Sequence, residues 1–141
     1  MFHIKKYEDR LAAWNQFRET LETEIDSIQS AIDYYDQAPR VSINTDPWDK
    51  ATWPDPWELV FENQYCAFCS VLGVCYSLQL TERFKKANFE IHIGIDREKS
   101  RTVYLLLIDN IVISWNEGKA TRAELSTTLQ VEKKYVMPRL Q

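Results

Sequence analysis

The sequence of 141 residues lacks a long apolar run, an internal repeat and a strong excess of one charge. No apolar stretch approaches the roughly 18 residues that suggest a membrane-spanning helix, so we expect no membrane segment. The formal net charge is only -4, which argues against a general nucleic-acid-binding protein and against binding to anionic membranes. The first residues show no long apolar core and no small-residue cleavage site, so we expect no signal peptide.

Cysteine is also sparse, and the three cysteines, Cys66, Cys69 and Cys75, fall close together in a helical pattern. The odd number and the crowding argue against a disulfide framework and favour a reducing, cytoplasmic location. Together with His92 they would offer three sulfurs and one nitrogen to a zinc ion. Structural zinc pairs usually lie in a knuckle near glycine or proline, whereas these cysteines lie in an apolar helix. We therefore predict no metal site and no cofactor.

The amino-acid composition is that of a folded domain, with 45% hydrophobic and 13% aromatic residues. The length favours one domain with one main core. Charge is distributed unevenly: residues 1–80 hold 13 acids and 6 bases, whereas residues 81–141 hold 8 acids and 11 bases. The sequence therefore predicts an acidic helical half and a mildly basic strand half.

Apolar residues recur at spacings of three and four through residues 7–37, which predicts one long amphipathic helix. Such a helix would be roughly 45 Å long, more than the roughly 30 Å width of a domain of this size. Either the whole stripe packs on the domain's own core, or its outer end packs on another protein chain. We expect the second arrangement, with the contact made by Trp14, Phe17, Leu21 and Ile25. The expected organisation is a helix over 1–37 and a core over 38–141, forming a single domain overall.

Residues 38–56 show no periodicity and are rich in proline. Trp48, Trp53 and Trp57 lie within ten residues there, and such large apolar side chains are rarely all left in water. We expect Trp53 and Trp57 to be largely buried on the core; a ligand groove is the alternative. Asp55 and Pro56 are a good N-cap and a good first residue for a short helix.

A buried core helix is predicted over 65–80, with Gly73 permitting close packing. Strands are predicted over 89–95, where apolar residues alternate, and over the apolar run 102–108. Asp109 and Asn110 form a turn into a strand over 111–115, and 127–131 is a further edge strand. The fold class is therefore α+β, with a long N-terminal helix, a buried core helix and a three- or four-stranded antiparallel sheet.

The order of these features resembles the core of the transglutaminase-like (papain-like) superfamily. The likeness is nearest to small bacterial transglutaminase-like cysteine peptidases. It rests on a Trp-x-x-Pro entry at Trp53, Cys66 at the start of the core helix, His92 on a strand, and Asp109-Asn110 ending the next strand. The Trp-Pro-x-Pro-Trp-Glu-Leu opening also resembles small proteins of tailed bacteriophages. Together these features cover about 60 of the 141 residues.

The resemblance implies acyl transfer by a catalytic triad. The Cys66 thiolate would attack a carbonyl carbon, His92 would take and return the proton, and Asp109 would hold the imidazole. Asn110 is an alternative for this third role. Each residue also has a purely structural interpretation: Cys66 as a small buried side chain, His92 as a strand histidine, and Asp109 as a turn residue.

The sequence departs from the peptidases around the cysteine. The peptidases have a glycine-rich approach and an acid after the nucleophile, whereas Gln64-Tyr65 precede Cys66 here and Ala67-Phe68 follow it. Glycines let a backbone donor approach a developing oxyanion. Two function classes stay open. The favoured one is a binding or assembly protein with a reduced, degenerate transglutaminase-like domain, such as a phage virion or assembly component. The other is a cysteine peptidase or amidase.

Overall fold

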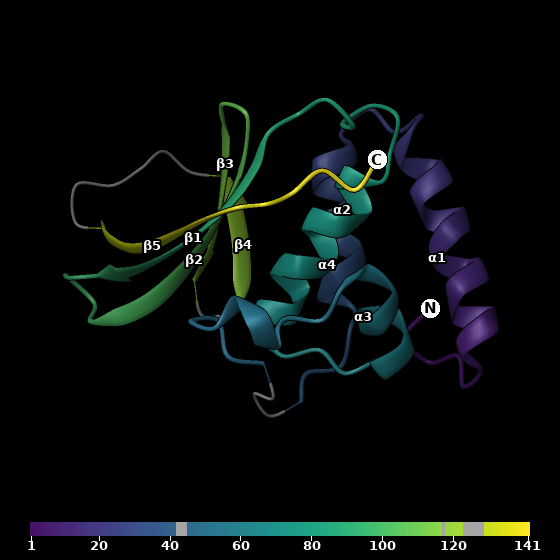
Figure 1. Cartoon of the computed structure of the whole chain (residues 1–141), viewed down its shortest axis with the longest axis horizontal. Coiled ribbons are helices and arrows are strands. Elements are labelled where there is room, and N and C mark those ends of the chain that lie inside the picture. Colours follow the sequence, from purple (N-terminus) through teal and green to yellow (C-terminus); the bar gives the residue numbers. More distant parts are fainter. Residues whose placement is uncertain (42–44, 117, 123–128) are drawn as a thin grey trace. The chain divides into compact units, whose positions relative to one another are not determined.

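The computed structural model describes residues 1–41, 45–116, 118–122 and 129–141, and it belongs to the α+β class (Figure 1). The chain forms two compact units. The helical unit comprises residues 1–85 and 140–141, and the sheet unit comprises residues 86–139. The division therefore lies after Lys85 and not after residue 37, because the second helix packs on the core helix and belongs to the same unit.

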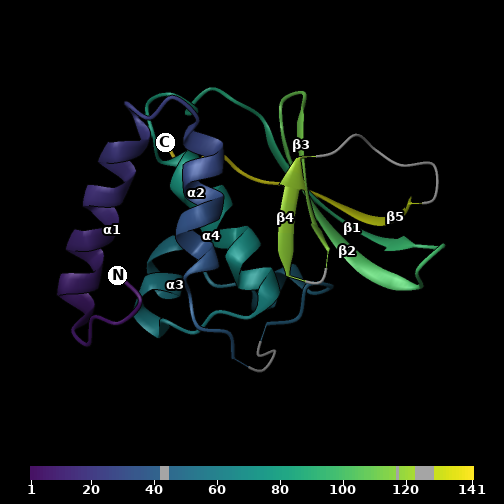
Figure 2. The same ribbon diagram turned by 180° about the vertical axis from the view of Figure 1, so that it is seen from behind.

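The helical unit contains α1 (Tyr7–Leu21), α2 (Ser27–Asp36), a short 3-10 helix η1 (Lys50–Thr52), α3 (Pro56–Glu62) and α4 (Ala67–Gln79). Figures 1 and 2, which view the molecule from opposite sides, both show α1 and α2 lying side by side. Within the described ranges, no helix combines the length and the apolar character needed to cross a membrane.

The prediction of one helix over 7–37 is wrong, because the chain folds back between α1 and α2. Asp26 is the N-cap of α2, and its carboxylate accepts a hydrogen bond of 3.1 Å from the Gln29 backbone N–H. Ile25, which continues the apolar stripe in sequence, lies fully exposed in the turn. The reversal places the Phe17 ring 3.6 Å from the Tyr34 ring in a stacked arrangement. Both helices thus place apolar side chains on one core.

The core of the helical unit is α4, whose residues 68–79 are all buried, as predicted. The Ser77 hydroxyl joins two other helices to it: Trp14 Nε1 of α1 donates to Ser77 Oγ over 2.9 Å, and Tyr35 Oη of α2 lies 3.0 Å from the same atom. Gly73 faces the Tyr35 ring so closely that an added Cβ would lie 2.3 Å from Tyr35 Cε1. The predicted close packing at Gly73 is confirmed.

Arg10 ties α1 to the end of α3. Its side chain is buried, with Nε donating to the Val60 carbonyl over 3.0 Å and Nη2 donating to the Phe61 carbonyl over 2.8 Å. Nη1 donates to the carbonyls of Ile4 and Lys5. Hydrogen bonds from a charged donor are stronger than neutral ones, and the last carbonyls of a helix favour a cation. Arg10 therefore fixes the angle between these two short helices.

The start of α3 confirms the predicted cap. Asp55 accepts a hydrogen bond from the Glu58 backbone N–H in a capping box, and Pro56 is the first helical residue. Trp53 is half-buried, with its ring 4.9 Å from the ring of Phe68. Trp57, in contrast, is 45% exposed, so the expectation that it is largely buried is wrong. The helix turns Leu59 and Val60 inward instead.

The sheet unit is one antiparallel sheet of five strands in the order β4-β3-β2-β1-β5. The strands are β1 (Phe89–Asp96), β2 (Arg101–Ile108), β3 (Ile111–Asn116), β4 (Lys119–Arg122) and β5 (Leu129–Val136). The sheet exceeds the predicted three or four strands because β4 pairs with β3. Of the predicted edge strand 127–131, residues 127–128 lie outside the described residues, and β5 continues to Val136. Phe89, Ile91 and Ile93 are buried, as their alternation predicts.

We predict that the substitution G73A lowers the free energy of unfolding by about 1–3 kcal/mol, because the added methyl would overlap the Tyr35 ring. In an open helix the same change would stabilise by up to about 1 kcal/mol. Urea unfolding of G73A, of Y35A and of the double variant tests the cause. The loss of unfolding free energy caused by G73A should disappear when Tyr35 is already alanine. An equal loss with and without Tyr35 would show that overlap with its ring is not the cause.

Candidate functional site

Two thiols meet at the start of α4. Cys66 is the N-cap residue, and its Sγ accepts a hydrogen bond of 3.4 Å from the Cys69 backbone N–H. The Cys69 Sγ lies 3.2 Å from the Cys66 Sγ. The preceding residue, Tyr65, is held by a parallel bridge to Arg40, so the chain enters the helix from a fixed direction. A sulfur at this position takes the place that a serine or aspartate oxygen occupies in most N-caps.

This arrangement separates the acidities of the three thiols. Hydrogen bonding from Cys69, with added support from backbone N–H groups at the helix start, lowers the pKa of Cys66 to about 6. The same interaction, together with burial, raises the pKa of Cys69. Burial alone raises the pKa of Cys75, whose Sγ donates to Gln79 Oε1 over 3.4 Å. Cys66 is therefore the thiol that ionises first.

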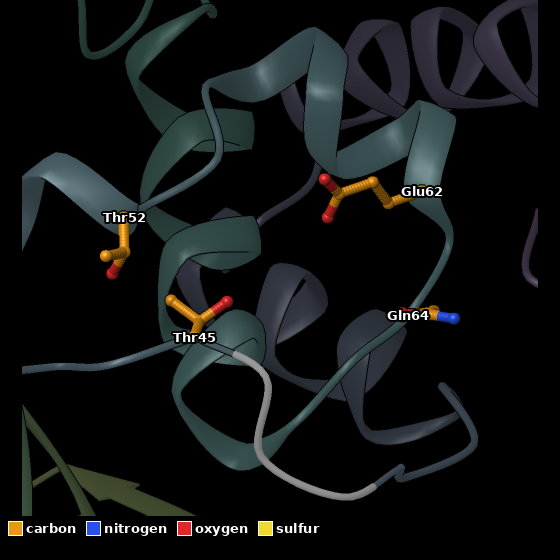
Figure 3. A pocket seen from close by; sticks show the side chains of 4 residues that line it. All are labelled: Thr45, Thr52, Glu62 and Gln64. Carbon is orange, nitrogen blue, oxygen red and sulfur yellow. The ribbon is translucent and has the colours of Figure 1, made fainter.

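A hollow of about 340 Å³ near the start of α4 is lined by Thr45, Thr52, Glu62 and Gln64. Figure 3 shows Thr45 and Glu62 pointing into it. The Thr45 Oγ1 also lies 3.5 Å from the Cys69 Sγ, so Thr45 links the hollow to the thiol pair. Sequence reasoning missed Thr45 and Glu62, because Thr45 lies in a loop without periodicity and Glu62 ends a short helix.

The other two predicted catalytic residues lie in the sheet unit. His92 is buried on β1, with Nε2 3.4 Å from Glu90 Oε1. Asp109 occupies the turn between β2 and β3 with a φ of 51°, and its carboxylate accepts a hydrogen bond of 2.9 Å from the Asn88 backbone N–H. Asn88 precedes His92 by four residues, which is roughly 13 Å along a strand.

The structure therefore does not bring Asp109 to the imidazole of His92; Glu90 is the acid beside it. Asp109 serves as a turn residue that closes the end of the β1–β2 pair. Cys66 belongs to the helical unit and His92 to the sheet unit. The pairing of Cys66 with His92 stays a prediction. Within the described residues, no three potential ligands among His, Cys, Asp and Glu gather closely enough to hold a metal ion.

The residues expected to bind another chain lie mostly inside the helical unit. Trp14 and Leu21 are buried within the helical unit. The cause is the reversal after α1, which lets one side of α1 pack on α2, α3 and α4. Phe17 is partly covered by its stacking on Tyr34, and Ile25 remains fully exposed. The expected contact of the N-terminal helix with another chain stays a prediction.

A different apolar surface remains open where α1 and α3 meet. Trp57 and Phe61, four residues apart on α3, are both exposed, and the Phe61 ring contacts the Tyr7 ring edge-on at 5.2 Å. A hollow of about 420 Å³ between the helices is lined by Glu8, Leu11, Ala12, Asn15, Arg18 and Trp57. We call these residues, with Tyr7 and Phe61, the α1–α3 surface. Sequence reasoning missed this surface, because it expected Trp57 to be buried on the core.

We predict that iodoacetamide modifies Cys66 at least about tenfold faster than Cys75 in the folded protein at pH 7. A thiol with a pKa of about 6 is mostly ionised at that pH, whereas an ordinary thiol near 8.5 is only a few per cent ionised. The rate at which iodoacetamide modifies Cys66 should be nearly constant between pH 8 and pH 7. It should decrease when the pH is lowered below about 6. Mass spectrometry of peptides gives the rates, with C75S as the control. A rate that keeps rising to pH 9 would contradict the assignment.

Comparison with known proteins gives no relative from which a role could be transferred. No family model, no curated protein and no solved structure matches the chain. The thiol pair and the α1–α3 surface must therefore be interpreted from their own chemistry.

Proposed function

We propose that the protein is a binding or assembly component that holds another protein chain on the α1–α3 surface. The single observation that carries this proposal is the exposure of Trp57 and Phe61 beside a preformed hollow. Tryptophan is enriched among the residues that dominate binding energy at protein interfaces. Trp57 is also held in place, since its ring packs edge-on against the buried Trp14 ring at 6.1 Å. A side chain ordered in advance loses little entropy on binding.

The charge of this region indicates the partner. Residues 1–85 hold 14 acids and 8 bases, and Glu8, Glu58 and Glu62 are exposed on α1 and α3. Arg18, the cation of the surface, lies over the Trp14 ring at 4.3 Å. The excess of acids over bases in residues 1–85 disfavours a second copy of the chain as the occupant of this surface. An amphipathic segment with apolar anchors and flanking lysine or arginine is complementary to it.

The sequence resemblances agree with this role. The likeness to the transglutaminase-like superfamily would make the protein a reduced scaffold of that type. The likeness to small proteins of tailed bacteriophages would make its partner another virion or assembly component.

A synthetic amphipathic helix tests the proposal. A peptide with leucines at positions i, i+3, i+4 and i+7 and lysines on its other faces should bind, more weakly as salt rises. The same peptide with glutamate in place of lysine should not bind. The substitution W57A should weaken binding about 30-fold, as expected for a residue worth about 2 kcal/mol. Calorimetric titration measures both affinities.

Trp48 provides a matched control, since it is 46% exposed but lies in the loop before η1. The substitution W48A should change the affinity by less than about twofold, within the range of a minor contact. Equal losses in W48A and W57A would contradict a specific surface. Light scattering on the isolated chain completes the test. A dimer that the substitution W57A dissociates would show that a second copy of the chain occupies the α1–α3 surface. This result would overturn the proposal of a basic partner.

The second candidate function is a cysteine hydrolase, and the ionisable Cys66 at the start of α4 favours it. In this case p-nitrophenyl acetate should acetylate Cys66, and the acetyl group should turn over. C66S should abolish the reaction and C75S should leave it intact. The substitution His92→Gln should slow turnover by about 100-fold or more if His92 is the general base. Turnover that persists in C66S would exclude this function.

A further inference from the structure

The start of α4 holds two sulfurs close to each other. Cys66 and Cys69 are three residues apart, and residues at this spacing in a helix have Cβ atoms about 5–6 Å apart. Disulfides have Cβ atoms about 3.5–4.5 Å apart and sulfurs about 2.05 Å apart, so the two residues must approach each other by about 1–2 Å to form one. The two sulfurs are already 3.2 Å apart. Small side-chain rotations and a slight approach of the two residues bring them to bonding distance.

The two thiols are chemically unequal, as attacking and resolving thiols need to be. The Cys66 sulfur accepts from the Cys69 backbone N–H at the helix start, where a negative charge is stabilised. The Cys69 sulfur lies beside the Thr45 hydroxyl and stays protonated more readily. Cys66 is thus the nucleophile of the pair and Cys69 the neighbour that completes the reaction.

The third cysteine, Cys75, lies too far from the pair to form a disulfide with it. It lies on the same helix, six residues beyond Cys69, which is about 9 Å along the helix axis. All three thiols are buried, and the Cys75 sulfur also donates a hydrogen bond to Gln79 Oε1 of the next turn. Cys75 therefore cannot take part in an intramolecular disulfide with either sulfur of the pair without unfolding of α4.

The hollow lined by Thr45 gives a small reagent a place one side chain away from the pair, whose sulfurs are both buried. Thr45 lines the hollow and its hydroxyl touches the Cys69 sulfur. Glu62 also lines it and adds a negative charge when ionised. A thiolate near a carboxylate repels anionic reagents, so an uncharged or cationic disulfide fits this site better than an anionic one.

We propose that Cys66 and Cys69 form a redox-active dithiol that exchanges with small uncharged or cationic disulfides. In the first step the Cys66 thiolate attacks one sulfur of R–S–S–R, forming a mixed disulfide and releasing RS⁻. In the second step the Cys69 sulfur attacks the Cys66 sulfur, its proton passes to the leaving RS⁻, and a second RSH departs. The two protein thiols are oxidised to one disulfide, and R–S–S–R is reduced to two thiols.

The test uses the full chain and 2-hydroxyethyl disulfide as the uncharged reagent. After incubation at neutral pH, the sample is acid-quenched, free thiols are alkylated, and mass spectrometry locates every cysteine. The proposal expects two thiols lost per chain, no retained reagent, a Cys66–Cys69 disulfide, and Cys75 still a thiol. Cystamine, which is cationic, should react at least about as fast, and glutathione disulfide, which is anionic, several-fold more slowly.

Single variants separate the two steps. C69S should retain the reagent as a stable mixed disulfide on Cys66. C66S should react at least tenfold more slowly than the wild type, and C75S should match the wild type. Circular dichroism checks that each variant is folded. The proposal is overturned if wild-type protein keeps the mixed disulfide, if the bridge involves Cys75 or a second chain, or if Cys66 reacts only in urea.

Discussion

The approach of α2 to α4 at Gly73 is the constraint on which the helical unit depends. The Tyr35 ring occupies the space that a side chain at position 73 would fill, so the two backbones come close together. A buried tyrosine hydroxyl needs a hydrogen-bond partner, and Ser77 supplies it one turn farther along α4. Ser77 also accepts from Trp14 and thereby fixes α1. One glycine and one serine of α4 thus place both N-terminal helices, and the placement of α1 leaves Trp57 open.

Features encoded by short patterns could be predicted from the sequence. The apolar run of α4, the glycine within it, and the Asp55-Pro56 start of α3 each have a local physical cause. The break between α1 and α2 has one local signal, the N-cap residue Asp26, but the apolar stripe runs on in register to Ile25 and predicts a continuous helix. The gain from packing both helices on one core favours the reversal there. Which side of α3 faces inward is likewise decided by tertiary packing, so the exposure of Trp57 could not be predicted.

The candidate site likewise combines features that could be predicted from the sequence with features that could not. The position of Cys66 at a helix start follows from the local sequence, and its neighbour Cys69 follows from the helical period. The relation of His92 to Asp109 depends on strand register, because the turn residue Asp109 pairs with Asn88 at the end of the sheet. Chain order alone could not reveal that separation. The short helix α3 contributes to both candidate sites, with Trp57 and Phe61 on the α1–α3 surface and Glu62 lining the hollow at Thr45.

The distribution of tryptophan gives each unit its own optical probe. Trp115 is the sole tryptophan in the sequence of the sheet unit, and it is buried on β3, whereas the other four belong to the helical unit. Tryptophan emission shifts to the red and becomes quenchable when the indole enters water. With the four helical tryptophans replaced by phenylalanine, the remaining emission would report the sheet alone. Loss of order in one unit can then be distinguished from loss of order in the other, which a signal averaged over the whole chain does not allow.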